Sequence, residues 1–425
     1  MIAQAGAEIN RCKVCVVGLG YIGLPTAVVL ASKVEGVSGY DIDTDRCDRI
    51  RNGISPFQEA GLDELLKYVV GTKRLEITQA VPSAETFLIA VPTPLAPDKS
   101  ADLSFLGAAI EAIAPKLTGD ELILVESTCP PGTTQTLKER VTAIRPDLAD
   151  AVALDRLGFA YCPERVLPGN ILQELASNDR IIGGLTGKSS QRAAELYESF
   201  CVGRMFLTDA RTAEVAKLAE NAYRDVNIAF ANELEQLCES HGVDIWELRE
   251  LANRHPRVNI LQPGPGVGGH CIAVDPWFLT DREHPAPLIR TARELNDAKP
   301  AKVAAKVLSL LKDKSRPRVL ALGLAFKENV DDTRQSPAIE VIKKLAASQR
   351  EVSIFAVDPL INACPAELRD YPAVSFSKFL PSDFSEFDAI VLLVAHEAFA
   401  ELRNSNLSET RIVDTRGVFR AINQH

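Results

Sequence analysis

The sequence predicts an α/β fold in which two Rossmann-like, doubly wound lobes are joined by a long central helix. Short apolar runs alternate with longer amphipathic stretches in two regions, residues 13–161 and 319–413, which is typical of βαβ units on a parallel sheet. Between these regions, residues 210–253 follow a helical period without a proline, so we expect one long helix followed by a short one. A length of 425 residues accommodates two or three domains.

Each predicted element corresponds to one of these runs. The strands of the first lobe are expected at residues 13–17, 37–40, 87–91, 122–126 and 159–162, and those of the second lobe at residues 319–322, 352–357, 389–394 and 411–413. Residues 256–276 are rich in glycine and proline and therefore predict a shaped loop, after which a helical pattern returns over residues 288–312. We divide the chain into domains at residues 1–206, 207–312 and 313–425.

Charge and cysteine content exclude several classes of protein. The chain has 47 Lys and Arg residues against 57 Asp and Glu residues, a net charge of −10, which disfavours a nucleic acid or an anionic membrane surface as partner. No run approaches the roughly 20 apolar residues of a membrane span. Residues 1–11 show no signal-peptide pattern, so we expect the nine cysteines to be reduced thiols in the cytoplasm. No two of the cysteines form a CxxC pair, so we expect no metal site.

A glycine-rich turn after the first predicted strand is typical of dinucleotide binding. The strand runs into Gly18-Leu-Gly20-Tyr-Ile-Gly23, a GxGxxG pattern, and a helical stretch follows. Gly18 allows the tight turn, Gly20 lets the backbone approach a pyrophosphate, and Gly23 permits close packing of helix on strand. Asp41 ends the next strand, where a carboxylate accepts both ribose hydroxyls and favours NAD over NADP. Arg46 is expected either to stack over the adenine or to meet a 2′-phosphate.

One of the nine cysteines is distinguished by its surroundings. Cys271 follows the glycine-rich segment 264–269, where missing side chains let a substrate carbon approach the sulfur while backbone N–H groups face a developing oxyanion. Asp275, four residues further on, is a candidate to orient a water or a lysine. His270 either tunes the thiolate or only packs. We predict that the other eight cysteines are small buried side chains.

Three polar residues of the long predicted helix lie on one face. Lys217, Asn221 and Arg224 fall at positions i, i+4 and i+7, so an ammonium, an amide and a guanidinium project together. Such a stripe is either a solvated helix surface or a set of groups that polarises a hydroxyl or an oxyanion.

Seven ordered motifs together resemble the UDP-glucose/GDP-mannose dehydrogenase family over essentially the whole chain. They are Gly18–Gly23, Glu126-Ser-Thr128 with Pro131-Gly-Thr133, Cys162-Pro-Glu164-Arg165, Lys217 with Asn221, Gly268–Cys271, Phe326-Lys327 with Asp332-Thr-Arg334, and Asp414-Thr-Arg416-Gly. The resemblance implies that residues 1–206 bind NAD, that residues 207–312 carry a catalytic loop and dimerise, and that residues 313–425 bind a UDP-sugar.

The resemblance implies an NAD-dependent, four-electron oxidation of a sugar C6 alcohol to a uronic acid. Lys217 and Asn221 match the residues that take the alcohol proton and stabilise the oxyanion. Cys271 matches the nucleophile that forms a thiohemiacetal and then a thioester. By the same matching, the water that hydrolyses the thioester is activated by a network of Thr128, Glu164 and Asp275.

Ligand contacts are implied in the same way. The residues that match cofactor contacts are Gly18, Gly20, Tyr21, Ile22, Gly23, Asp41, Arg46, Thr93, Thr128 and Arg334. Those that match sugar-nucleotide contacts are Arg165, Val166, Lys217, Asn221, Arg224, His255, Arg257, Gly268, Phe326, Lys327 and Arg416. The implied partners are a UDP-N-acetylhexosamine and a second copy of the chain, forming a homodimer in which His255 and Arg257 reach the neighbouring site.

The segment from Asn253 to Phe278 is most similar to the family branch that oxidises UDP-N-acetyl-D-mannosamine, with the UDP-N-acetyl-D-glucosamine branch as the alternative. Ala273-Val274 precede Asp275 where members acting on UDP-glucose carry a lysine, which disfavours UDP-glucose. The expected product is an acidic sugar for a surface polysaccharide. Two other hypotheses are a two-electron hydroxyacid dehydrogenase, which needs no Cys271, and an NAD-responsive binding module without turnover.

Overall fold

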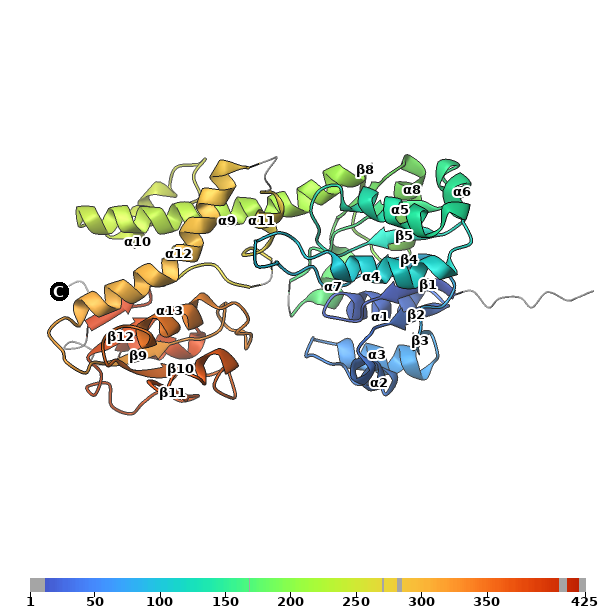
Figure 1. The fold of residues 1–425 in the computed structure, drawn as a ribbon. Helices are drawn as coiled ribbons and strands as arrows, with labels where there is room; N and C mark the ends of the chain where they lie inside the picture. The colour runs from blue at the N-terminus through green and yellow to red at the C-terminus, as the bar shows by residue number, and fades with distance from the viewer. Residues whose placement is uncertain (1–11, 168, 270, 281–284, 405–410, 420–425) are drawn as a thin grey trace, which may run out of the picture. The chain divides into compact units, whose positions relative to one another are not determined.

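The computed structural model describes residues 12–167, 169–269, 271–280, 285–404 and 411–419. The protein forms two compact units, residues 1–219 and 220–425, and each contains one β-sheet (Figure 1). Helix α9 (Ala210–His241) begins in the first unit and ends in the second.

The first unit is built on an eight-stranded sheet with the order β3-β2-β1-β4-β5-β6-β7-β8. Neighbouring strands are parallel except β6 and β7, which are antiparallel. The strands are β1 (Cys12–Val17), β2 (Val37–Tyr40), β3 (Leu75–Thr78), β4 (Ala84–Ile89), β5 (Leu122–Val125), β6 (Gly158–Tyr161), β7 (Arg180–Gly184) and β8 (Met205–Asp209). The helices are α1 (Gly23–Lys33), α2 (Thr44–Arg51), α3 (Leu62–Gly71), α4 (Ser104–Ile113), α5 (Thr133–Ile144), α6 (Ala149–Ala153), α7 (Ile171–Ser177) and α8 (Gly187–Glu198).

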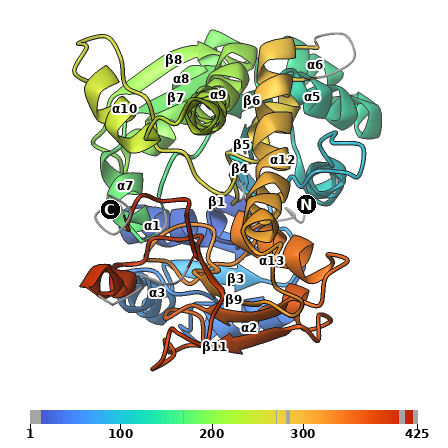
Figure 2. The same ribbon diagram turned by 90° about the vertical axis from the view of Figure 1, so that its left-hand side faces the viewer.

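The second unit contains a five-stranded parallel sheet with the order β11-β10-β9-β12-β13. Its strands are β9 (Arg318–Leu322), β10 (Ser353–Val357), β11 (Val374–Ser377), β12 (Ala389–Leu392) and β13 (Arg411–Asp414). Its helices after α9 are α10 (Ile245–Ala252), α11 (Asp275–Phe278), α12 (Pro287–Leu310) and α13 (Pro337–Ala346). Helix α12 crosses α9, as Figures 1 and 2 show from two directions.

Each sheet carries an apolar core on both of its faces. Strand β1 sends Val14 and Val16 into one core and Cys15 and Val17 into the other, because successive side chains of a strand point to opposite faces. Strand β9 divides its buried residues in the same way. Burial on both faces explains why these strands read as continuous apolar runs.

The predicted fold class is confirmed, and α9 followed by α10 matches the expected long and short helices. Four strands were missed, and three of them, β3, β8 and β11, lie at sheet edges. The division into domains 1–206, 207–312 and 313–425 stays a prediction. None of the helices in the described part of the chain combines the length and apolar composition that a membrane span needs.

Candidate active site

The glycine turn between β1 and α1 is tight at two positions and open at a third. Gly18 has φ +95°, and a Cβ there would lie 2.5 Å from the Ala90 carbonyl oxygen. A Cβ at Gly23 would lie 1.9 Å from the Gly18 carbonyl oxygen. At Gly20 a Cβ would meet no heavy atom within 4 Å. The turn therefore leaves room at Gly20 for a pyrophosphate beside the helix N-terminus, where Ile22 is the half-buried N-cap.

Asp41 is held by three donors. Its Oδ2 accepts hydrogen bonds from Leu19 N at 2.7 Å and Arg46 Nη1 at 2.9 Å, and its Oδ1 accepts one from Asp43 N at 2.9 Å. Arg46 also pairs with the Asp43 carboxylate at 3.3 Å, so both of its partners here are carboxylates. A hollow beside Asp41 is lined by the end of β2, by α2 and by the end of β3, which suits the adenosine half of a dinucleotide.

Two further predicted cofactor contacts have protein partners. The Tyr21 ring packs against Phe57 with centroids 4.7 Å apart. Thr93 Oγ1 donates a hydrogen bond to the Thr128 carbonyl oxygen at 2.5 Å, which joins the segments that follow β4 and β5. Both segments leave the carboxyl ends of parallel strands, the edge of such a sheet at which ligands bind.

Glu164 has a carboxylate whose two oxygens are both engaged. Oε1 accepts a hydrogen bond from Arg165 N at 2.7 Å, and Oε2 pairs with Arg180 Nη1 at 3.1 Å. The Glu164 and Arg180 side chains are 6% and 3% exposed, and the guanidinium lies 4.5 Å from the centroid of the Tyr197 ring. Val166 packs against the neighbouring core. Arg180 was not predicted to belong to the site; it is the charged residue that begins the otherwise apolar strand β7.

The polar stripe on α9 changes from buried to exposed along the helix. Lys217 is 7% exposed, Asn221 is half-buried and Arg224 is exposed. The solvated alternative therefore holds at Arg224, while Lys217 is largely removed from water.

Cys271 is exposed, whereas every cysteine side chain described from Cys15 onward, other than Cys271, is buried or half-buried. Asp275 begins α11 and donates its backbone N–H to the Cys271 carbonyl oxygen at 2.8 Å. The Asp275 carboxylate is buried and accepts a hydrogen bond from Asn221 Nδ2 at 2.6 Å. Three of the predicted catalytic residues, Asn221, Cys271 and Asp275, are thus linked. His270 lies outside the described residues.

The space that side chains would take at the two glycines before residue 270 is occupied by other protein atoms. A Cβ at Gly268 would lie 2.4 Å from the Gln335 carbonyl oxygen, and one at Gly269 would lie 3.1 Å from the Phe326 ring. The missing side chains therefore admit neighbouring chain segments here, rather than opening space for a substrate carbon as expected. The same packing brings the predicted substrate residues Gly268 and Phe326 to one loop cluster.

The two C-terminal arginines predicted to bind ligands have different surroundings. Arg416 has a buried Nε with no hydrogen-bond partner among the described residues, and burial lowers the pKa of its guanidinium. An unpaired buried donor of this kind suits an anionic or carbonyl oxygen of a ligand. Arg334 is exposed and forms a two-pronged pair with Asp332, with Nη2 and Oδ2 2.6 Å apart. Three further predicted substrate contacts are exposed: His255, Arg257 and Lys327.

Comparison with known protein families decides the class of this site. Three models of the UDP-glucose/GDP-mannose dehydrogenase family match in order: the NAD binding domain over residues 12–201, the central domain over residues 211–298 and the UDP binding domain over residues 320–421. The chain belongs to this family. The resemblance predicted from the motifs is therefore confirmed, as are NAD as cofactor and dehydrogenase as the class of enzyme.

Individual members of the family are similar over nearly the whole chain. The NDP-N-acetyl-D-galactosaminuronic acid dehydrogenase of Ralstonia nicotianae is 49% identical over 97% of this chain and 98% of its own. The UDP-N-acetyl-D-mannosamine dehydrogenase of Campylobacter jejuni is 45% identical over 93% of this chain and 98% of its own. The solved UDP-D-ManNAc dehydrogenase of Pyrococcus horikoshii superposes with a TM-score of 0.81 at 37% identity, covering 96% of each chain.

Proposed function

We propose that the protein oxidises the C6 hydroxyl of a UDP-N-acetylhexosamine to the uronate in two NAD-dependent steps, with Cys271 as nucleophile. The observation that carries this proposal is the exposed Cys271 thiol on a segment that is bonded through Asp275 to Asn221. A two-electron dehydrogenase has no use for such a thiol, whereas a four-electron enzyme needs one to retain the aldehyde.

The first oxidation requires an acceptor for the alcohol proton. When bound, NAD takes the hydride that leaves C6 in each oxidation. Lys217, with Asn221 and an ordered water, receives the proton, and the near-complete burial of Lys217 removes competing solvent.

The second oxidation proceeds on sulfur. The Cys271 thiolate adds to the aldehyde carbon, and the carbonyl oxygen becomes an oxyanion that Lys217 and Asn221 stabilise. Loss of the second hydride converts this thiohemiacetal into a thioester. Water then adds to the thioester carbon, and its proton passes to the carboxylate network of Glu164 and Asp275. The carbon–sulfur bond breaks, releasing the uronate and the thiolate.

The surroundings of Glu164 favour an orienting role in that last step. Each carboxylate oxygen has two lone-pair sites, so Glu164 can hold a water while its oxygens also accept from Arg165 N and Arg180. Thr128, whose carbonyl oxygen is fixed by Thr93, belongs to the same proposed network.

The remaining ligand contacts are proposed from the family motifs. Arg416 offers its unpaired Nε to the nucleotide half of the substrate. Arg334 reaches a cofactor phosphate only if its pair with Asp332 opens. The other proposed substrate contacts are Arg165, Val166, Arg224, His255, Arg257, Gly268, Phe326 and Lys327.

The mannosamine epimer is the proposed substrate, because the segment around Cys271 is most similar to that branch of the family. A second candidate is the galactosamine epimer, which is favoured by the relative that is 49% identical. The product would supply an acidic sugar for polysaccharide biosynthesis. The cytoplasmic location expected from the cysteine content stays a prediction.

An absorbance assay at the NADH band with a panel of UDP-sugars tests the proposal. The panel contains the N-acetyl mannosamine, glucosamine and galactosamine epimers together with UDP-glucose. We expect two NADH per sugar with one N-acetylhexosamine, and accumulation of aldehyde in Cys271→Ser. The matched control is Cys364→Ser, which changes a half-buried thiol outside the proposed site and should retain the two-to-one ratio. Release of free aldehyde by the wild type with one NADH per sugar would overturn the proposal.

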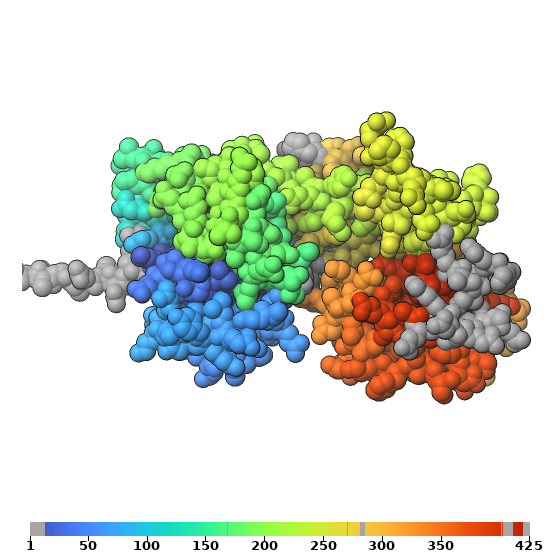
Figure 3. Space-filling view, turned by 180° about the vertical axis from the view of Figure 1, so that it is seen from behind, coloured from blue at the N-terminus to red at the C-terminus, as the bar shows by residue number. Residues whose placement is uncertain are grey.

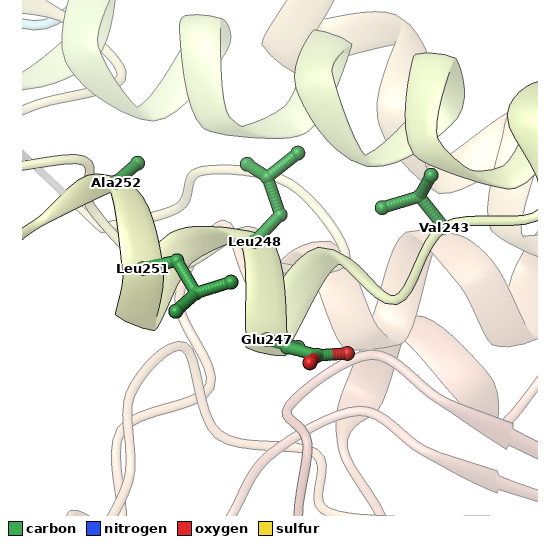
Figure 4. Close-up of a pocket in the computed structure, with 5 residues that line it drawn as sticks. All are labelled: Val243, Glu247, Leu248, Leu251 and Ala252. Atoms are coloured by element: carbon green, nitrogen blue, oxygen red, sulfur yellow. The ribbon is translucent and has the colours of Figure 1, made fainter.

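We also propose that the chain forms a homodimer through α9. Tyr223, Phe230 and Leu237 recur every seven residues and are 70%, 53% and 52% exposed, so an apolar stripe runs along the helix. The surface from α9 into α10, yellow-green to yellow in Figure 3, is uncovered on that face of the second unit. A shallow apolar hollow adjoins it, where Val243 and Leu248 point to one side of α10 and Glu247 to the other (Figure 4).

Light scattering tests the dimer. Phe230→Glu is expected to halve the molar mass, whereas Phe379→Glu, which charges an even more exposed ring just after β11, should leave it unchanged. Mixed dimers of Arg257→Ala and Cys271→Ser subunits should recover activity if Arg257 serves the neighbouring site. A wild-type monomer at assay concentration would refute the dimer.

A further inference from the structure

Two buried asparagines connect the crossing helices to the segment before Cys271. Asn232 on α9 donates from Nδ2 to Asn296 Oδ1 on α12 at 2.9 Å, and its own Oδ1 accepts a hydrogen bond from Gly264 N at 2.9 Å. Asn232 is 0% and Asn296 1% exposed. With both ends of the Asn232 amide engaged, its orientation is fixed, and so is the position of the Gly264 backbone.

A fully buried ion pair continues the same network. Arg293 on α12 pairs through Nη1 with Asp225 Oδ1 on α9, and the same Nη1 donates to the Ile272 carbonyl oxygen at 3.3 Å. Asn296 Nδ2 bonds Asp225 twice, at Oδ1 (2.8 Å) and at the backbone oxygen (3.0 Å). The hydrogen bonds therefore run without a break from Gly264 to Ile272, the residue that follows Cys271.

The ion pair is an unfavourable choice for stability alone. Asp225 Oδ2 and Arg293 Nε are buried with no hydrogen-bond partner among the described residues. Burying two charges costs several kcal/mol per ion before any pairing energy is recovered, and apolar residues of similar volume often serve a core as well or better. The buried Asp225–Arg293 pair is therefore better explained by a role other than stabilising the core.

The segment that carries the thiol needs external support. Residues 264–269 contain four glycines, whose backbone has little conformational preference of its own. The position of Cys271 must therefore be imposed by contacts from outside the loop. The network supplies two such contacts, one at Gly264 and one at Ile272.

We infer that Asp225, Asn232, Arg293 and Asn296 are positioning residues that hold Cys271 in place for attack on the aldehyde. This inference rests on the proposed role of Cys271 as nucleophile. Hydride loss from the alcohol requires no bond to sulfur, whereas thiohemiacetal formation requires the sulfur within about 3.5 Å of the carbon. Loosening the loop should therefore slow the second oxidation much more than the first.

Two network variants and one control separate positioning from general stability. Asn232→Ala removes the acceptor for Gly264 N, and Arg293→Lys keeps a cation beside Asp225 but cannot also span to Ile272. Gln236→Ala is the matched control: one turn further along α9, Gln236 accepts from Lys302 on α12 at 2.6 Å and has no bond to the described residues of the loop.

The readouts are hydrogen exchange of the loop peptide, thermal denaturation, and the NADH yield per sugar with a hydrazide to trap aldehyde. For both network variants we expect exchange of the loop amides to accelerate at least tenfold. We also expect aldehyde oxidation to slow by about 10²-fold while alcohol oxidation changes less than fivefold, so that the NADH yield falls from two toward one. The control should match the wild type.

Equal loss of both oxidations in the variants, or no loss, would overturn the inference. Unchanged exchange of the loop amides would do the same. If the wild type oxidises none of the sugars, the proposed function fails. In that case the hydrogen exchange of the loop amides in the variants alone decides whether the network holds the loop. Should Asn232→Ala not fold, Arg293→Lys carries the same comparison.

Discussion

Replacing Glu126 by glutamine tests how much the ionisation of a buried carboxyl group lowers the free energy of unfolding of the first unit. Glu126 directly follows β5 and is 3% exposed. Tyr197 donates its hydroxyl to Oε1 at 2.6 Å, and Thr26 donates to Oε2 at 3.3 Å. Burial and the neighbouring Glu164 carboxylate raise the pKa of Glu126 from 4.5 to about 7, against the opposing Arg180 guanidinium. Glutamine keeps the shape and removes the charge.

The sign of the effect follows from proton binding. Between pH 4.5 and about 7 the folded chain keeps a proton on Glu126 that the unfolded chain has lost, so the free energy of unfolding falls as the pH rises through this window. At about 1.4 kcal/mol per pKa unit, the total is at most about 3.5 kcal/mol. Glu126→Gln should therefore gain up to about 3.5 kcal/mol over the wild type at pH 8 relative to pH 4.5, roughly 7–14 °C in Tm.

Thermal denaturation of both proteins from pH 4.5 to pH 8.5 measures this difference. Glu121, at the other end of β5, is the control, because its burial is outweighed by hydrogen bonds from Thr118 and Gly119 that lower its pKa. Glu121→Gln should therefore destabilise the protein most at neutral pH and least in acid. If Glu126→Gln follows the wild-type pH profile, or if its advantage shrinks as the pH rises, the assignment of a neutral, buried Glu126 is wrong.

The other predictions concern the glycine turn and a helix cap. Gly20→Ala should retain the wild-type Tm but lose at least tenfold in NAD affinity by fluorescence titration, because its Cβ meets nothing until a phosphate approaches. Gly23→Ala should lower both the Tm and the NAD affinity, since its Cβ would clash with the Gly18 carbonyl oxygen. Equal effects of the two variants on Tm would contradict the assignment of Gly20 to the phosphate site and Gly23 to helix packing. Ser336→Ala should cost about 1–2 kcal/mol in urea denaturation, because Ser336 Oγ caps α13 and donates to Ala325 O at 3.1 Å.

Most of the strands that sequence patterns revealed are buried on both faces, although the half-buried edge strand β13 was also found. β1, β2, β5 and β9 were found within one residue at each end, because burial on both sides of a parallel sheet makes a run continuously apolar. β8 was missed because its residues are exposed or half-buried at every position, as edge strands often are. β7 was missed because it begins with Arg180, and a charged residue there does not predict a strand.

Residues of the candidate site could be proposed from the sequence where chemistry restricts the residue type, but not where only the fold brings residues together. Cys271 and Asn221 stood out by local spacing, but the bond from Asn221 to Asp275 joins residues 54 positions apart. Arg293 was missed for a related reason. Its pairing with Asp297 at i, i+4 is typical of a solvated helix surface, whereas the side chain is fully buried.

In both lobes an aspartate after one strand accepts a hydrogen bond from the turn after the neighbouring strand, but the surroundings of the two aspartates differ. Asp358 directly follows β10 as Asp41 directly follows β2, and each accepts from the backbone N–H of a leucine, Leu324 and Leu19 respectively. In the second lobe, however, Asp358 is 0% exposed and also bonds His396 Nε2 at 3.0 Å, so its carboxylate is used within the protein.

The turns that follow the first strand of each lobe also differ in sequence. The first lobe reads Gly18-Leu-Gly-Tyr-Ile-Gly23, and the second reads Gly323-Leu-Ala-Phe-Lys-Glu328. Because a Cβ at Gly23 would lie 1.9 Å from the Gly18 oxygen, Glu328 at the matching position cannot adopt that turn, and the chain instead runs through residues 323–336 before α13 begins. This longer loop carries Phe326, which packs on the glycines before Cys271. Without the pyrophosphate turn, the second lobe has a loop that contacts the segment carrying Cys271, which is compatible with the match of residues 320–421 to the family's UDP binding domain.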